Sequence, residues 1–193
     1  MNDTAGKIFY NITESIYDSF ECTRLFLFFR AASLIFSLKG KNSVGDDNTL
    51  QVIYCADRLR IEGDGTLNAV CNGLSISAEN GMEIEGATVN AMSYNDCLHS
   101  GSGGDISIKD AVVTADTYSY GIWTKGAISI EDTTGRTRVK AVSQSGYDAV
   151  LGVSGIKVTS VRIVTPEGGY IYGSYVLDSQ HNSQKSMQTK KSS

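Results

Sequence analysis

The sequence predicts a parallel β-solenoid, expected as a right-handed β-helix of about five or six coils. Three observations support this all-β fold class. A short segment rich in aliphatic residues recurs about every 23 residues along the chain. The 193 residues include 20 glycines and one proline, which favours tight turns between closely spaced strands over helical bundles. The frequent Val, Ile, Thr and Tyr residues are typical of strands.

The recurring segment has an alternating pair of aliphatic residues, a turn and another aliphatic residue. Its copies are FSLKGKNSV from Phe36, LRIEGDGTLNA from Leu59, MEIEGATVNA from Met82, ISIKDAVVTA from Ile106, ISIEDTTGRTRVKA from Ile128 and IKVTSVRIVTP from Ile156. The second aliphatic residue of each copy is a marker, namely Leu38, Ile61, Ile84, Ile108, Ile130 and Val158. Their spacings are 23, 23, 24, 22 and 28 residues, and the segment TTGRTR lengthens the last. Because side chains alternate along a strand that recurs in every coil, we expect the markers to form one buried column.

A second inward strand is expected between consecutive markers. Its sign is a small or modest residue followed by an aliphatic residue, at Val52-Ile53, Gly73-Leu74, Cys97-Leu98, Gly121-Ile122 and Ala149-Val150. A sandwich of antiparallel hairpins also has short strands at regular spacing. It does not require the same residue types at the same place in every repeat, so the repeat favours the solenoid.

The chain divides into three predicted parts: a cap over residues 1–35, the β-helix over residues 36–177 and a polar tail over residues 178–193. A solenoid needs caps because open strand edges promote aggregation. Residues 13–30 are expected either as a capping helix or as a degenerate first coil. The helix would begin at Thr13 and place Ile12, Ile16, Tyr17 and Phe20 on one face. The Ser/Gln-rich tail, with Lys185, Lys190 and Lys191, is predicted to be disordered from Ser179 onward.

Several functional classes are disfavoured by composition. The net charge of −4 argues against a nucleic-acid surface, which needs a basic stripe. The apolar run of residues 25–38 contains Arg30 and is too short to span a bilayer. The four cysteines, Cys22, Cys55, Cys71 and Cys97, form no C-x-x-C pair, so we expect packed or free thiols.

No catalytic set is recognisable, and an enzyme is not predicted. The two histidines, His99 and His181, leave little for a catalytic triad or a zinc site. Glycoside hydrolases need paired carboxylates across the scissile bond. In the repeat register Glu62, Glu85, Lys109 and Glu131 fall in one outward column. We interpret this column as a solvated ladder whose like charges are relieved by the lysine.

Aromatic residues gather beside the second inward strand over three successive coils. They are Tyr94, His99, Tyr118, Tyr120, Trp123 and Tyr147. His99 and Trp123 follow Leu98 and Ile122 directly, so they point outward if those two residues point inward. Such a platform would bind a ligand by ring stacking. The alternative is that the rings pack against their neighbours for stability, with only the hydroxyl groups in water.

The repeats resemble those of large surface proteins from gut and soil Firmicutes, which are described as carbohydrate-binding or adhesin-like. The resemblance rests on SLKGKNSV, LRIEGDGTLNA, GMEIEGATVNA, AISIED and VTPEGGYI, between about residues 37 and 175. The segment NDCLHS, residues 95–100, is similar to an element of a calcium-associated, polyuronate-binding β-helix family. Calcium needs about six converging oxygen ligands, and the segment contributes one acid, Asp96. No cofactor is therefore predicted, with calcium as the alternative.

The leading functional hypothesis is a non-catalytic surface module that binds glycans or another cell-surface partner. The resemblance implies an extracellular location at a bacterial cell surface, although residues 1–11 show no signal-peptide pattern and no wall anchor is recognisable. Two alternatives remain: a structural spacer or stalk, and a polysaccharide lyase or hydrolase acting on pectin-type chains. The expected partner is a polysaccharide or cell-surface glycan, without nucleic acid or a membrane span, and the chain is expected as a monomer or part of a larger protein.

Overall fold

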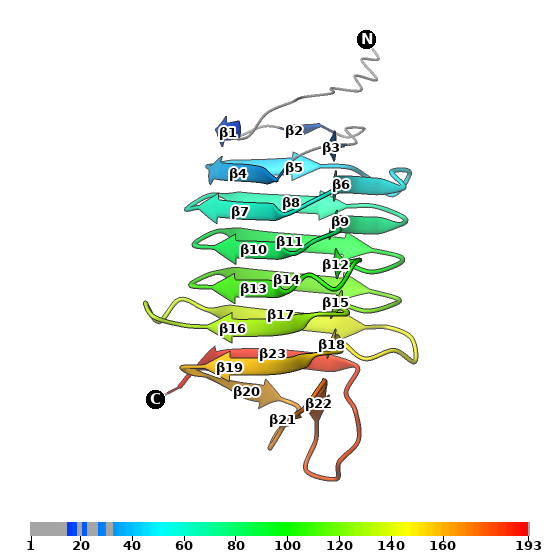
Figure 1. The fold of residues 1–193 in the computed structure, drawn as a ribbon, viewed down its shortest axis with the longest axis vertical. Coiled ribbons are helices and arrows are strands. Elements are labelled where there is room, and N and C mark those ends of the chain that lie inside the picture. Colours follow the sequence, from blue (N-terminus) through cyan, green and yellow to red (C-terminus); the bar gives the residue numbers. More distant parts are fainter. Residues whose placement is uncertain (1–14, 19–20, 23–26, 30–32, 193) are drawn as a thin grey trace.

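The computed structural model describes residues 15–18, 21–22, 27–29 and 33–192, with side chains from Ser33 to Ser192. Its strands stack along the long axis of the molecule in three sheets, and the described residues contain no helix (Figure 1). Each coil contributes one strand to each sheet, as in β7 (Leu59–Gly63), β8 (Thr66–Val70) and β9 (Leu74–Ala78). About five such coils follow one another, so the predicted parallel β-solenoid is confirmed.

The three sheets are named here by their strands. Sheet A contains β1 (Ser15–Asp18), β4 (Leu34–Lys39), β7 (Leu59–Gly63), β10 (Met82–Glu85), β13 (Ile106–Lys109), β16 (Ala127–Glu131) and β19 (Gly155–Thr159). Sheet B contains β2 (Glu21–Cys22), β5 (Lys41–Val44), β8 (Thr66–Val70), β11 (Thr88–Ser93), β14 (Val112–Thr117), β17 (Arg138–Ser143), β23 (Ser186–Lys191) and β20 (Val161–Thr165). Sheet C contains β3 (Leu27–Phe29), β6 (Gln51–Cys55), β9 (Leu74–Ala78), β12 (Leu98–Ser100), β15 (Ile122–Thr124), β18 (Val150–Gly152), β22 (Tyr175–Leu177) and β21 (Tyr170–Tyr172).

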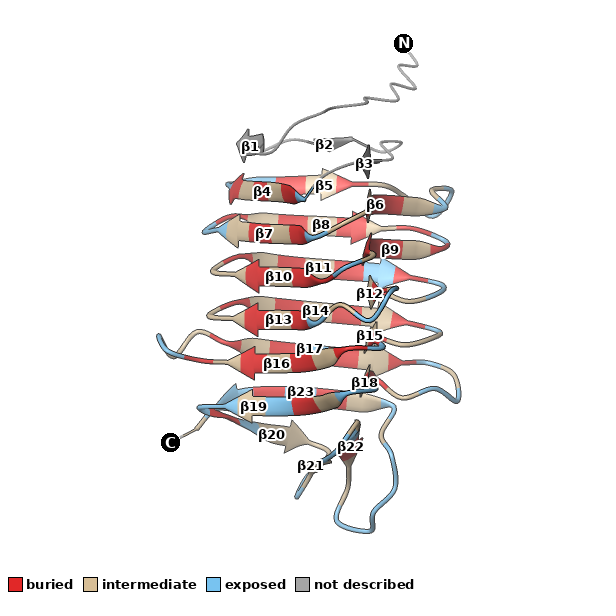
Figure 2. Cartoon of the chain, viewed as in Figure 1, coloured by how far each residue is buried: buried red, intermediate tan, exposed pale blue. Residues whose placement is uncertain are grey.

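The predicted isoleucine column exists in sheet A. Ile61, Ile84, Ile108 and Ile130 pair in register from coil to coil and are 0% exposed. Val158 continues the register but is only partly buried, because it lies near the end of the stack. Buried residues alternate with more exposed ones along most strands, as expected when one face of each sheet points into the core (Figure 2).

Two residues, Leu38 and Leu74, do not lie in the inward columns predicted for them. Ile61 pairs with Phe36 and not with Leu38, which instead lies opposite Gly63. Strand β4 buries one inward residue more than β7, and a Cβ at Gly63 would lie 2.3 Å from the carbonyl oxygen of Leu38. The glycine therefore permits this close approach.

The other misplaced member lies in sheet C. Ile76, not Leu74, pairs with Ile53 and Leu98, while Leu74 pairs with Gln51 and stays half-buried. The pair Ser75-Ile76 fits the same pattern of a small residue before an aliphatic one. Sequence spacing alone does not distinguish the two registers.

The described segments before residue 33 are strands that continue the stack. β1, β2 and β3 pair in parallel with β4, β5 and β6. These segments contain no helix, in contrast to the capping-helix alternative, and their pairing matches a degenerate first coil. Thr13, Ile12 and Phe20 of the proposed helix lie outside the described residues.

The prediction of a disordered tail was wrong for residues 186–191. These residues form β23, which pairs antiparallel with β17 on one side and with β20 on the other. Met187 and Thr189 point inward and are 0% exposed, and Thr189 Oγ1 accepts a hydrogen bond from the backbone N–H of Val139 at 3.0 Å. The tail thus covers the edge that β17 would otherwise leave unpaired. In the segment SMQTKK, the buried residues Met187 and Thr189 alternate with more exposed polar residues. This alternation indicates a strand, although the polar composition of the segment suggested disorder.

No helix of the described residues has the length and apolar character needed to cross a membrane.

The sheet A column makes a stability prediction. Ile108→Asp places an unpaired charge in the centre of the core and is expected to cost more than about 4 kcal/mol in the free energy of unfolding. Urea unfolding followed by circular dichroism would measure this. The control Ser129→Asp adds the same charge to the outward face of β16, in register with Lys157, and should change stability little. Equal effects of the two substitutions would contradict the register.

The C-terminal strand makes a second prediction. A chain that ends at Leu177 lacks β23 and leaves the edge of β17 unpaired, so it should melt at a lower temperature and self-associate. A chain that ends at Lys191 keeps β23 and is the control. Thermal unfolding and size-exclusion chromatography report the two effects. A monomeric Leu177 truncation with wild-type melting would show that β23 is dispensable.

Candidate functional site

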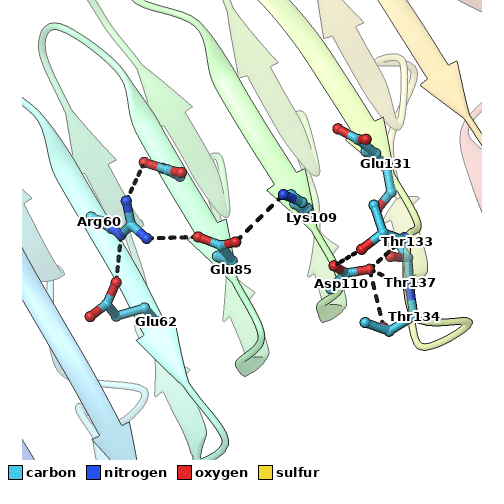
Figure 3. A network of polar contacts seen from close by, with 10 residues as sticks. Arg60, Glu62, Glu85, Lys109, Asp110, Glu131, Thr133, Thr134 and Thr137 are labelled. Atoms are coloured by element: carbon cyan, nitrogen blue, oxygen red, sulfur yellow. Dashed lines mark hydrogen bonds and ion pairs between the residues drawn. The ribbon is translucent and has the colours of Figure 1, made fainter.

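The outward charged column of sheet A is an ion-pair network (Figure 3). The guanidinium of Arg60 donates to Glu62 at 2.5 Å, to Glu83 at 3.3 Å and to Glu85 at 2.7 Å. Lys109 Nζ lies 3.7 Å from the other carboxylate oxygen of Glu85. The predicted column is confirmed, but its central residue, Arg60, was not expected. The cations hold like charges together across coils, which explains these acids without catalysis.

The next turn of the same face is held by Asp110 (Figure 3). Its carboxylate accepts hydrogen bonds from the backbone N–H of Thr133 at 2.6 Å and of Thr134 at 3.0 Å, and from both threonine hydroxyls. Desolvation opposes ionisation of this group, but the four hydrogen bonds outweigh it and lower the pKa of Asp110 to about 2. Asp110 therefore anchors the enlarged turn that lengthens the last marker spacing.

An aromatic column follows the outward face of sheet C. The strand register aligns Tyr54, Ser77, His99, Trp123, Leu151, Tyr175 and Tyr172, one residue from each successive strand. We call this set the sheet C ridge. Adjacent strands lie about 4.8 Å apart, so six steps give a ridge about 29 Å long that runs along the stacking direction. Tyr172 and Tyr175 are 70% and 42% exposed.

The centre of the ridge is made of contacting rings. The centroids of His99 and Trp123 lie 4.4 Å apart in an edge-to-face arrangement. Tyr120 stacks on Trp123 at 6.0 Å and contacts Tyr147 at 4.9 Å. The flanking residues of β12 and β15 are buried while His99 and Trp123 are partly exposed, so both rings point outward as predicted.

A hydrogen bond with Asp96 fixes the orientation of the His99 imidazole. His99 Nδ1 lies 2.9 Å from Asp96 Oδ2, and Asp96 Oδ1 accepts the backbone N–H of Tyr120 at 3.2 Å. Burial opposes ionisation of Asp96, but its hydrogen bonds with His99, Ser119 and Tyr120 outweigh burial and lower its pKa. The carboxylate thus orients the ring and joins two coils.

Tyr94 and Tyr118 form a separate pair. Their rings stack at 4.9 Å with planes inclined by 28°, and they are 57% and 49% exposed. They line a groove of about 340 Å³ at the end of sheet B. We call it the tyrosine groove, and its polar lining residues include Asp47, Asn72, Asp116 and Gln144. The six aromatic residues predicted from the sequence are therefore divided between two adjoining surfaces.

No protein-family model, curated protein sequence or solved structure matches the chain. The interpretation of the site therefore depends on its geometry, and the resemblance to Firmicutes surface proteins stays a prediction.

The sequence pattern missed residues at both surfaces. Tyr172 and Tyr175 were not expected on the ridge because their hairpin lies outside the repeat. Asp47 and Asn72 were not expected in the groove, although each occupies the position of Tyr94 in an earlier coil. Counting three residues beyond Val44 and Ala69, the last inward residues of β5 and β8, would have found them.

A second hollow lies over the start of sheet A. It has a volume of about 510 Å³, and its lining includes Arg58, Arg60, Asn80, Glu83 and Asp105 but no aromatic residue. Two of its four charged residues, Arg60 and Glu83, belong to the ion-pair network. It therefore offers hydrogen bonds without a ring surface.

Residues 33–192 contain no cluster of side chains suited to metal binding or thiol chemistry. No three His, Cys, Asp or Glu side chains of this range converge on one point, and calcium at NDCLHS stays the untested alternative to the prediction of no cofactor. Cys55, Cys71 and Cys97 are buried, in line with the predicted packed or free thiols, and the side chain of Cys22 lies outside the described residues. Burial raises the pKa of Cys97 to about 12, which keeps it protonated and unreactive.

The turn around Asp110 gives a prediction with a defined pH dependence. Its folded pKa of about 2 lies below the unfolded value of about 3.9, so its stabilisation is present above about pH 4 and is lost as pH falls toward 2. Asn tolerates the positive φ at this position. Asp110→Asn is expected to lower the melting temperature by about 2–4 °C at pH 7 and hardly at pH 2.

The control for this change is Asp64→Asn, which removes the same charge from an exposed turn residue for which the structure shows no hydrogen bond. Thermal unfolding at the two pH values distinguishes the variants. A pH-independent deficit in Asp110→Asn would rule out the charge as its cause.

Proposed function

We propose that this protein is a non-catalytic glycan-binding solenoid whose sheet C ridge contacts a polysaccharide at a bacterial cell surface. The observation that carries the proposal is the alignment of Tyr54, His99, Trp123, Tyr175 and Tyr172 in one outward column. Aromatic faces offer apolar contact area, while their polar atoms remain near water.

The shape of the ridge supports an extended ligand. Each member of the ridge occupies the equivalent position in successive paired strands, so the ridge follows the stacking direction. Its length of about 29 Å exceeds what a single sugar can contact. A linear polymer lying along the stacking direction would contact several rings at once, so each ring adds to binding without a closed pocket.

The exposure of the rings also supports a ligand role in addition to core packing. The core of the solenoid is filled by aliphatic residues and alanines, including Ala69, Ala91, Ala115 and Ala141 of sheet B. The ridge residues lie outside this core. The two hairpin tyrosines remain 42% and 70% exposed, which is more than packing between neighbours requires.

The key test is Trp123→Ala. Because the ring is outward, its loss should leave folding intact while weakening binding by five- to tenfold, which corresponds to about 1–1.4 kcal/mol of stacking. Affinity electrophoresis against a panel of soluble polysaccharides measures retention. Trp123 is the single tryptophan of the chain, so its fluorescence in the wild type also reports contact with a ligand directly.

The matched control is Val153→Ala, which removes an exposed apolar side chain in the turn after β18, outside the ridge and the tyrosine groove. It should bind like the wild type. Absence of retention on every polysaccharide, or equal retention of Trp123→Ala and the wild type, would disprove the ridge as a glycan site and favour a spacer.

A further inference from the structure

The tyrosine groove adjoins the ridge through the short turn that follows sheet B. Tyr118 lines the groove, and Tyr120, two residues later, packs on Trp123. The groove therefore belongs to the surface that a polymer on the ridge would meet next. Its lining differs from the ridge because it combines rings with carboxylate and amide groups.

The polar groups of the groove form a line parallel to the stack. Continuing the register of sheet B beyond its strands aligns five groove residues from successive coils, namely Asp47, Asn72, Tyr94, Tyr118 and Gln144. Gln144 Nε2 donates a hydrogen bond to Asp116 Oδ1 at 2.7 Å, which fixes the amide at the groove and leaves the second carboxylate oxygen for other donors. Sugar hydroxyl and amino groups are such donors.

The charge of this lining has one sign. Asp47 is exposed and has neither a hydrogen bond nor an ion pair among the described residues, and no Lys, Arg or His lines the groove. The adjoining ridge is also close to acids. Burial raises the pKa of Tyr120, and the negative charges of Asp148 and Asp96 raise it further. A carboxylate brought to the groove would meet repulsion from Asp47 and Asp116, and no Lys, Arg or His of the groove lining would offset it.

The outward face of sheet B beside the groove is mostly uncharged in the same coils. Asn90 donates to Asn68 Oδ1 at 2.9 Å, and Asn68 donates to Ser43 Oγ at 3.2 Å, so amides and hydroxyls form a ladder between coils. The one cationic side chain of this column in the same coils is Lys140, while Lys41 and Arg138 lie in the other outward column of sheet B. The amide and hydroxyl column therefore suits hydroxyl-rich ligands.

We infer that the tyrosine groove is a second part of the glycan site and that it selects polysaccharides without carboxylate groups, meaning neutral or amino-bearing chains. The inference rests on the proposed glycan-binding function. The stacked Tyr94 and Tyr118 supply the ring surface, and Asp47 and Asp116 supply acceptors that also repel uronic acids. The polyuronate ligands of the family that NDCLHS resembles are thereby disfavoured.

The test uses pairs of polymers that share a backbone and differ in charge. One pair is fully methyl-esterified homogalacturonan and polygalacturonate, and the other is hydroxyethyl cellulose and carboxymethyl cellulose. At low ionic strength the wild type is expected to bind the neutral member at least about fivefold more tightly. The reason is that the carboxylates of Asp47 and Asp116 repel the anionic member. In 0.5 M NaCl the preference should shrink, because salt screens the repulsion.

The double substitution Asp47→Asn and Asp116→Asn preserves side-chain shape and removes the charges. It should reduce the ratio of neutral to anionic affinity to about one, whereas Val153→Ala should keep the wild-type ratio. Anionic binding as tight as neutral binding in the wild type, or an unchanged ratio in the double variant, would overturn the charge selection alone. Lack of binding to any of the four polymers, with Trp123 fluorescence unchanged, would instead overturn the proposed function and this inference with it.

Discussion

The parallel, in-register pairing of each strand with its copies in the coils above and below is the constraint on which the structure depends. It places equivalent residues about 4.8 Å apart, and repeats that spacing along the whole stack. On the inside, this makes columns such as Ile61 to Ile130, where each aliphatic side chain packs on its counterpart. On the outside, it forces whatever residue type the repeat contains into a line. The surface chemistry of the protein is therefore organised in linear arrays.

The same spacing has opposite consequences for charged and aromatic residues. Carboxylates in one column repel each other, so the line through Glu62 and Glu85 persists because Arg60 and Lys109 neutralise it. Aromatic rings at this spacing attract each other by edge-to-face and offset stacking, as His99 and Trp123 do. A line of rings needs no compensating partners and stays accessible. This difference leaves the sheet C ridge available for the ligand contact proposed above, whereas the charges of the sheet A column are taken up by ion pairs within the protein.

The parallel stack of sheet B ends at β17, whose edge would leave backbone N–H and C=O groups unpaired. The chain covers this edge by inserting β23 in the antiparallel direction between β17 and β20. An antiparallel strand satisfies the hydrogen bonds of the edge but does not offer the repeating register to a further coil. The hairpin of β21 and β22 ends sheet C similarly and, in doing so, adds Tyr175 and Tyr172 to the ridge.

The sequence by itself determined the features that depend on the repeat: the solenoid, the isoleucine column, the outward acids and the outward direction of His99 and Trp123. Period and alternation are local properties, so they can be counted along the chain. Only the tertiary structure decided what depends on pairing between coils of unequal length. Leu38 and Leu74 fit the pattern but lie out of register, because neighbouring strands differ in their number of inward residues. The strand β23 and the groove residues Asp47 and Asp116 were likewise decided by pairing partners from other coils, which composition and spacing do not identify.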